Sequence, residues 1–390
     1  MQDLPLYVNF AKLTDQPWDG RILSLENFFK QKINIWRWVM SYSHVQCIGY
    51  KINTLELDKK NNYLGAVSTI DINNRCTIMK NAMLEALAKA SEKNDSNCLK
   101  IFMAPEFFFR DANGAYPIEA VSSIMETLRE QTNEMHFKDW LFIFGTAIAY
   151  LTNVDSKEVF NIAMVQSGWT KSVDFPPALI VYKEYVSHMD FIRDKANKWG
   201  KNRRALIGRE SWWSFLLGRD RDMSLLRPTE GSRDLESKKI NKVGKGKEKT
   251  KSGLGGQGYF EMKGVHFGLE ICLDHFKSRL RASPPEKGDF YPQIHLIPSG
   301  GASIQEESIA CGNKGIIFNV DARHTALNCN KGTFVEPKAK YKDGTGKLIS
   351  IPPEKFKLKE FQGSNKYFKD LGYLEIYPRL PIPEKVKVTA

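Results

Sequence analysis

Residues 266–276, "HFGLEICLDHF", place Cys272 directly after a short apolar run and before an acidic residue and a histidine. A short apolar run is typical of a buried strand, and the groups that meet a ligand in a layered domain often follow such strands. Cys272 is therefore a buried core thiol, a metal ligand or a nucleophile, and the rest of the chain has to decide among these roles.

Helical and strand-like segments alternate on the N-terminal side of this stretch. Apolar residues recur at helical spacing from Met79 to Ala90, and the run "LKIFMAP" that follows predicts a buried strand ending at Pro105. Next come "PIEAVSSIMETLREQ", in which Pro117 suits a first helical turn, and the strand-like "LFIFGTAIAYL".

The alternation continues around and beyond Cys272. The expected segments are strands at "ALIVYK", "VHFGLEI", "QIHLIPS" and "GIIFNVDA", and a helix at "SIQEESIACGN". Strands that alternate with helices predict an α/β fold built from layers.

The composition is that of a globular protein with a sizeable core, since 42% of its 390 residues are hydrophobic. No charged-then-apolar region opens the chain and no apolar run approaches the ~20 residues that span a bilayer, so we expect a cytoplasmic, soluble protein. The cysteines show no CxxC pairing, which argues against a zinc site and a dense disulfide framework. Most are expected to be small core residues; they are Cys47, Cys76, Cys98, Cys272, Cys311 and Cys329.

The positive charge is concentrated in one segment. Residues 193–251 hold eighteen basic and eight acidic residues, which accounts for +10 of the net charge of +12. The first half of this segment mixes basic and aromatic residues and suits a helix or lid, whereas 238–251 is rich in lysine and glycine. Such a cover favours an anionic substrate or macromolecule, nucleic acid included, and the alternative is a solvated surface loop.

Three reactive residues follow three of the apolar runs. Glu106 follows "IFMAP", Lys183 follows "ALIVY" and Cys272 follows "VHFGLEI". Together they make an acyl-transfer set, in which a thiolate attacks, a carboxylate moves protons and an ammonium stabilises an oxyanion. A neighbouring Lys183 is also expected to lower the pKa of Cys272 from its reference of about 8.5, giving thiolate near neutrality.

The segments "APEFFF", "VYKEYVSHMDF" and "GLEICLDHF" occur in this order. Together they resemble the three signature segments of the nitrilase superfamily of carbon–nitrogen hydrolases. The resemblance extends to "GGQGYFEMKGVHFG", "HLIPSGGAS" and "GNKGIIFNVDAR", and covers roughly residues 63–192 and 253–330. It implies an αββα four-layer sandwich of the nitrilase type.

The resemblance also implies roles for individual residues. Glu106 would be the general base, Lys183 the oxyanion-stabilising lysine and Cys272 the nucleophile. The backbone N–H of Leu273 would be a second oxyanion donor, and Asp274 matches the acid that members commonly carry two residues after the cysteine.

The chain departs from the family pattern at a second glutamate, which members often carry shortly after the lysine. At that place the sequence reads "SHMDFIRD", and Glu184, Asp190 or the more distant Glu210 could substitute. Leu273 stands where an aromatic residue is frequent. The separation of Lys183 from Cys272 is long because the basic segment lies between them.

Supporting residues complete the expected site. Phe107, Phe108 and Phe109 are expected mainly in the core, with Phe107 also lining the substrate pocket beside His188 and Ser299. His188 and His275 are expected to be structural or orienting rather than metal ligands, because no second histidine stands at ligand spacing. We expect Cys311 and Cys329 to be structural.

The sequence thus predicts an N-terminal extension (1–62), a catalytic domain (63–330) with a basic insertion or lid (193–252), and a C-terminal extension (331–390). The resemblance implies that the C-terminal extension wraps a partner subunit in a homodimer or higher oligomer. The predicted activity is amide hydrolysis on a small-molecule amide without a metal or organic cofactor. A nitrile substrate and acyl or amidino transfer remain open. So does a catalytically inactive binding module that grips an anionic partner or nucleic acid through 238–251.

Overall fold

The computed structural model describes most of the predicted catalytic domain and the C-terminal region. The described residues are 42–59, 63–67, 69–90, 96–152, 157–169, 178–183, 226–228, 258–282, 284–285, 288–311, 315–322, 331–335 and 348–388. All of them belong to one unit of the chain, Ser41–Ala390.

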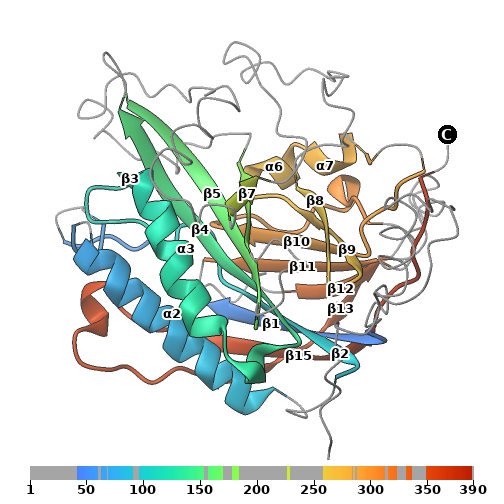
Figure 1. Cartoon of the computed structure of the whole chain (residues 1–390), viewed down its shortest axis with the longest axis horizontal. Coiled ribbons are helices and arrows are strands. Elements are labelled where there is room, and N and C mark those ends of the chain that lie inside the picture. Colours follow the sequence, from blue (N-terminus) through green and yellow to red (C-terminus); the bar gives the residue numbers. More distant parts are fainter. Residues whose placement is uncertain are drawn as a thin grey trace, which may run out of the picture. The chain divides into compact units, whose positions relative to one another are not determined.

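The first of two sheets runs in the order β14-β15-β1-β2-β4-β5-β6-β7, and β3 pairs with β4 (Figure 1). Its strands are β1 (His44–Lys51), β2 (Cys98–Met103), β3 (Tyr116–Pro117), β4 (Trp140–Thr152), β5 (Lys157–Ser167), β6 (Ala178–Tyr182), β7 (Leu226–Pro228), β14 (Glu354–Lys357) and β15 (Tyr373–Pro381). Strands β1, β2 and β4 are parallel, and β6 is antiparallel to β5, which is antiparallel to β4. The carboxyl ends of β2 and β6 therefore lie at the same edge.

The second sheet runs in the order β13-β12-β11-β10-β9-β8. Its strands are β8 (Tyr259–Met262), β9 (Val265–Leu269), β10 (Ile294–Ser299), β11 (Ile316–Asp321), β12 (Lys331–Val335) and β13 (Leu348–Ile351). Strands β9, β10 and β11 are parallel neighbours, so their carboxyl ends also meet at one edge.

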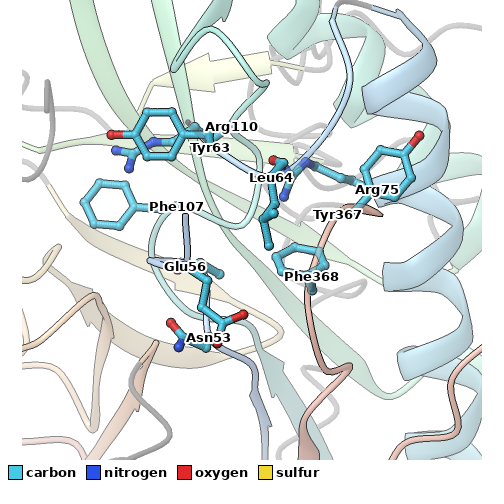
Figure 2. A pocket seen from close by; sticks show the side chains of 10 residues that line it. Asn53, Glu56, Tyr63, Leu64, Arg75, Phe107, Arg110, Tyr367 and Phe368 are labelled. Carbon is cyan, nitrogen blue, oxygen red and sulfur yellow. The ribbon is translucent and has the colours of Figure 1, made fainter. Parts of the chain in front are cut away.

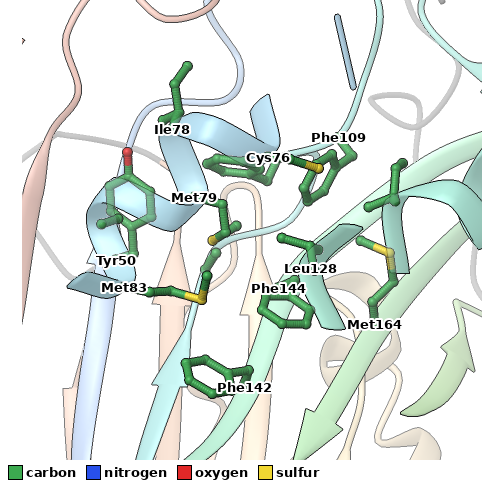
Figure 3. Close-up of a cluster of buried hydrophobic side chains, with 14 of the residues drawn as sticks. Tyr50, Cys76, Ile78, Met79, Met83, Phe109, Leu128, Phe142, Phe144 and Met164 are labelled. Carbon is green, nitrogen blue, oxygen red and sulfur yellow. The ribbon is translucent and has the colours of Figure 1, made fainter. Parts of the chain in front are cut away.

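Helices α2 (Thr69–Lys89) and α3 (Glu119–Thr132) cover one face of the first sheet. The apolar face of α2, with Cys76, Met79 and Met83, lies over the aromatic side chains Tyr50 and Phe142 (Figure 3). Burying one such side chain stabilises the fold by about 1.5–3 kcal/mol, so this layer contributes strongly to holding the first sheet.

A second apolar core lies between the two sheets. Alternate residues of β1, β2 and β4 pack against alternate residues of β9, β10 and β11; among them are Cys47, Ile101, Ile143, Phe267, Leu296 and Phe318. The alternation follows from the two-residue period of a strand, which gives each sheet one face for this core.

The outer face of the second sheet is covered more sparsely. In the described part of the chain it carries the four-residue helices α6 (Leu273–Phe276) and α7 (Arg279–Ala282) and the 3-10 turn η4 (Glu306–Ser308). A small cluster of Ile297, Ile309, Cys311 and Ile317 lies beneath the last of these. The layered α/β class predicted from the sequence is confirmed, with two sheets at its centre.

Most predicted elements occur where expected, and two predictions are wrong. Pro117 does not open a helix, because it forms the short strand β3 beside β4 and α3 begins at Glu119. The described part of "SIQEESIACGN", residues 303–311, is not an α-helix, because it runs as a loop interrupted only by η4, whose entry residue Gln305 is extended. Remaining short 3-10 turns are η2 (Met135–Phe137) and η5 (Ser364–Lys366).

The regions assigned to extensions are integrated into the sheets. The range 1–62 supplies β1, and 331–390 supplies β12 to β15, with β15 pairing antiparallel to β1 within the first sheet. Within the predicted insertion, β7 adds a strand beside β6. The remaining insertion, including 238–251, lies outside the described residues, so the lid and the wrapping of a partner stay predictions.

Two further findings concern the described residues. None of the helices there is long and apolar enough to cross a membrane. The cysteines among them are buried and form no disulfides with one another, as expected for small core residues: Cys47, Cys76, Cys98, Cys272 and Cys311.

Gly145 lets the strand β4 approach the loop that follows β2. The β4–β5 register shifts between Ile143 and Thr146, and Gly145 has a φ of +72°. A Cβ at this position would lie 2.2 Å from the carbonyl oxygen of Pro105, which a side chain cannot occupy. Glu106 is the residue after Pro105, so this close approach fixes the position of the Glu106 backbone.

We expect Gly145→Ala to lower the free energy of unfolding by about 2–5 kcal/mol, because it adds left-handed backbone strain and a backbone overlap. Gly363→Ala is the matched control, since Gly363 has a φ of +85° but nothing within 4 Å of the added Cβ. It should cost only the strain, about 1–2 kcal/mol. Urea denaturation measures both, and equal losses would contradict the role assigned to the close approach.

Candidate active site

The structure brings together the three reactive residues that follow different strands. Glu106 comes three residues after β2, Lys183 directly after β6 and Cys272 three residues after β9. The N–H of Glu106 donates to the carbonyl of Ser299 at 3.3 Å, which joins the end of the first sheet to the end of β10 in the second. The site therefore lies where the carboxyl ends of β2 and β6 in the first sheet meet those of β9 and β10 in the second.

Glu106 is the centre of this group. Its Oε1 accepts hydrogen bonds from Lys183 Nζ at 2.7 Å and from Asn161 Nδ2 at 2.7 Å. The side chain of Lys183 is 1% exposed and that of Glu106 is fully buried, so water screens this ion pair very little. Asn161 also holds the lysine, because its carbonyl accepts the N–H of Lys183 at 2.9 Å.

The loop that carries Glu106 is held by two threonines. Thr54 Oγ1 donates to the carbonyl of Glu106 at 2.5 Å, and the N–H of Phe107 donates to Thr146 Oγ1 at 2.9 Å. Phe107 has a φ of 66°, which is uncommon for a residue with a side chain. Such strain costs about 1–3 kcal/mol and persists where surrounding contacts fix the backbone, as these do.

Cys272 lies in a sharp turn between β9 and α6. Its φ is 47° and its ψ is −102°, and its N–H donates to the carbonyl of Pro298 at 3.2 Å. The next N–H, of Leu273, meets no acceptor among the residues that the structure describes. Leu273 is half-buried, so its N–H remains available to a ligand oxygen beside the thiol.

The surroundings of Cys272 disfavour its thiolate form. Burial raises the pKa of Cys272 well above its usual range, and the nearby carboxylate of Glu106 raises it further. Lys183 and the backbone of Gly300 act in the opposite direction but are outweighed. The expectation of thiolate near neutrality is therefore wrong, because burial outweighs the lysine charge and Glu106 also opposes it.

Ser299, Gly300 and the next two residues form a turn over the thiol. Asp321 Oδ2 accepts hydrogen bonds from Ser299 Oγ at 2.7 Å, Gly301 N at 2.5 Å and Ala302 N at 2.8 Å. A Cβ on Gly300 would lie 2.6 Å from the Phe107 ring and 3.0 Å from Glu106 Oε2. Only glycine therefore allows this turn to approach the site, and the role of Ser299 in a substrate pocket stays a prediction.

A pocket opens beside Phe107 at the same end of the first sheet (Figure 2). The Arg110 guanidinium lies 4.0 Å from the centre of the Phe107 ring and 4.7 Å from that of Tyr63. Lys183 Nζ lies 5.7 Å from the Phe107 ring centre. The Phe107 ring thus separates the pocket from the ion pair, as a pocket wall would.

The other predicted site residues divide into two groups. Asp274 is fully buried within α6, and its N–H donates to the carbonyl of Ile271 at 2.9 Å. Glu184, His188, Asp190 and the more distant Glu210 lie outside the described residues, so their roles stay predictions.

Sequence reasoning missed several residues that shape the site. Asn161 is a polar residue inside the apolar strand β5, and that interruption could have marked it. Thr54 follows β1 and contacts Glu106 only through the tertiary fold. The sequence spacing shows no histidine partner for His275, but the fold brings the ring of His295 to 5.3 Å from its ring.

The chain is similar to several solved structures. No protein-family model and no curated protein matches this chain. Among solved structures it is similar to Nit3 of Saccharomyces cerevisiae, a member of branch 10 of the nitrilase superfamily, with 11% identity and a TM-score of 0.39 over 88% of this chain and 92% of that one.

Two further structures are similar. An amidase from Nesterenkonia sp. has 9% identity and a TM-score of 0.37 over 87% of this chain and 91% of that one. XC1258 from Xanthomonas campestris, a CN-hydrolase superfamily protein, has 12% identity and a TM-score of 0.31 over 79% of this chain and 86% of that one.

The site geometry predicts an unusual response to Glu106→Gln. Removing the carboxylate charge lowers the pKa of Cys272, since Glu106 raises it and Lys183 lowers it. Iodoacetamide should therefore alkylate Cys272 at pH 7 about tenfold faster or more, because the thiolate is the reactive form. In the wild type the alkylation rate should keep rising with pH above neutrality, as expected for a raised pKa.

Peptide mapping by mass spectrometry measures this rate. The buried thiols of Cys47, Cys76 and Cys98 are internal controls, since they react only if the variant opens. Alkylation of Cys272 that stays as slow in Glu106→Gln as in the wild type would contradict the assigned proton holder.

Proposed function

We propose that this protein is a carbon–nitrogen hydrolase of the nitrilase type, an amidase that cleaves a non-peptide or side-chain amide through a cysteine thioester. The observation that carries the proposal is the convergence of Glu106, Lys183 and Cys272 on one buried point, with the ammonium bonded to the carboxylate and both charges close enough to shift the pKa of the thiol. Nucleophile, base and cation in mutual hydrogen-bond reach are the geometric requirement of acyl transfer.

In the first step the sulfur of Cys272 attacks the amide carbon while its proton passes to Glu106. The carboxylate lies close enough to raise the pKa of the thiol, so proton transfer can accompany attack without a stored thiolate. The carbonyl oxygen gains negative charge. Lys183 Nζ and the N–H of Leu273 are the groups that stabilise it in this mechanism.

In the second step the tetrahedral intermediate collapses to a thioester. The C–N bond breaks and the leaving nitrogen takes the proton from Glu106, so that ammonia or an amine departs. Glu106 then accepts a proton from water, whose oxygen attacks the thioester carbon. The carbon–sulfur bond breaks, and the proton held by Glu106 returns to the Cys272 sulfur.

The proposed mechanism fits more than one class of substrate. A nitrile carbon would accept the same attack, and an amine could replace water in the second step. We propose a small-molecule substrate, and a homodimer as the minimal assembly. The basic insertion would favour an anionic substrate.

The proposal predicts a trapped acyl-enzyme. Wild-type protein is to be mixed with a panel of aliphatic amides, with and without a carboxylate, and with the matching nitriles, then quenched in acid. Intact mass should increase by the acyl group, and peptide mapping should locate it on Cys272. Cys272→Ala should abolish both the adduct and turnover, and Lys183→Met should lower kcat about 100-fold to 1000-fold by removing oxyanion stabilisation.

Full turnover in both Cys272→Ser and Glu106→Gln would overturn the mechanism. Release of ammonia from amides but not nitriles would assign the amidase reaction, and the reverse would assign a nitrilase. An acyl product that appears only when an amine is added would assign a transferase.

A further inference from the structure

A second carboxylate lies behind the thiol, in a network that the proposed reaction does not use. Glu270 follows β9, His275 belongs to α6 and His295 to β10, and all three side chains are fully buried. His275 Nδ1 lies 2.7 Å from Glu270 Oε1, and His295 Nε2 lies 3.0 Å from the same oxygen. Glu270 Oε2 accepts the N–H of Leu280 at 3.1 Å.

The ring nitrogens that do not face Glu270 show which nitrogen of each histidine carries its proton. The N–H of Gln305 donates to His275 Nε2 at 2.8 Å, so that nitrogen carries the lone pair and the proton of the neutral ring is on Nδ1. The N–H of Ala310 lies 3.4 Å from His295 Nδ1, which places the proton of that ring on Nε2 in the same way. The proton of His275 bonds Glu270, and that of His295 sits on a nitrogen 3.0 Å from the same carboxylate oxygen but not aligned for a hydrogen bond.

The pKa shifts of Glu270 and His295 agree with this assignment of protons. Burial alone would raise the pKa of Glu270, but its contacts with His295 and His275 outweigh burial and hold that pKa well below the usual range. Burial lowers the pKa of His295, which favours a neutral ring. The network is therefore one carboxylate with neutral N–H donors around it.

A metal centre is the competing interpretation. One ligand atom from each of Glu270, His275 and His295 lies within 4.8 Å of the others, which is close enough to share an ion. However, a metal on His275 Nδ1 would take the only lone pair of a neutral ring, whereas Nε2 already needs that lone pair to accept the Gln305 N–H. A histidine ligand normally donates from its other nitrogen, so this geometry favours hydrogen bonds over a metal.

The network encloses the turn that carries Cys272. Glu270 stands two residues before the cysteine and His275 three residues after it, so their 2.7 Å contact spans the strained residue. Through His275 the network also holds Gln305, at the far end of the loop that begins at Gly300. Gly300 supplies the N–H that bonds the Cys272 sulfur.

We propose that Glu270, His275 and His295 are positioning residues that hold Cys272 in its strained turn and hold the Gly300 loop against the sulfur. Both rings are neutral, with the proton of His275 on Nδ1 and that of His295 on Nε2. The proposal rests on the proposed function in taking Cys272 as the nucleophile, and its test includes measurements that need no substrate.

The first measurement is on the wild-type full-length chain. Nitrogen-15 NMR of histidine-labelled protein at pH 7 should show His275 protonated on Nδ1 alone and His295 on Nε2 alone. Metal analysis of the same sample, before and after addition of Zn²⁺, should show no stoichiometric ion at these rings. A His275 proton on Nε2, a doubly protonated ring, or one bound Zn²⁺ that shifts both rings would overturn the proposal.

The second measurement uses Glu270→Gln, which places an amide NH₂ among partners that all donate. If the Gly300 N–H withdraws from the sulfur, the pH profile of Cys272 alkylation should move to higher pH. Glu106 and Lys183, the charged groups that face the sulfur, are unchanged in this variant. With an identified amide, kcat should fall about 100-fold while KM changes little, as expected for a misplaced nucleophile.

Glu375→Gln is the matched control, because Glu375 is buried in the first sheet beside Lys51, away from the thiol. It should lower stability without moving the alkylation profile or kcat. His295→Gln keeps an N–H donor for Glu270 and should retain most of kcat, whereas His295→Leu should not. An unchanged pH profile of Cys272 alkylation in folded Glu270→Gln would overturn the proposal. If this variant does not fold, the NMR measurement on the wild type tests the proposal instead.

Discussion

The buried ion pair between Lys183 and Glu106 is the constraint on which the rest of the site depends. Removing two opposite charges from water costs several kcal/mol for each ion, and only close contact with further hydrogen bonds offsets that cost. The 2.7 Å contact and the second donor, Asn161, supply both. Burial and the charge of Glu106 together outweigh the lysine charge and disfavour the Cys272 thiolate, and Glu106 is the nearby carboxylate that can take its proton.

The backbone around the pair is shaped to bring three strand ends to one point. Phe107 and Cys272 both adopt positive φ angles, and Gly145 and Gly300 stand where any Cβ would overlap the loop of Glu106. Strain of this kind costs about 1–3 kcal/mol at each residue and persists only when packing fixes the chain. The core between the sheets and the threonine contacts of the loop provide that restraint.

Local pattern in the sequence predicted the strand ends and therefore the reactive residues. Glu106, Lys183 and Cys272 follow β2, β6 and β9, because a short apolar run and the polar residue after it specify a buried strand and its end. What could not be predicted depends on residues far apart in the chain. The pairing of β15 with β1 and the approach of His295 to His275 are set by tertiary packing, and the state of the thiol follows from burial that only the fold reveals.

The site region holds two buried carboxylates, and their surroundings separate their roles. Glu106 lies close enough to the thiol to raise its pKa, so a proton can move between them as sulfur attacks. Both oxygens of Glu270 are occupied by His275, His295 and the N–H of Leu280, and its low pKa keeps it ionised. A carboxylate surrounded only by donors cannot accept a further proton without losing them. Glu270 therefore suits a fixed support, and the exchange of protons is left to Glu106.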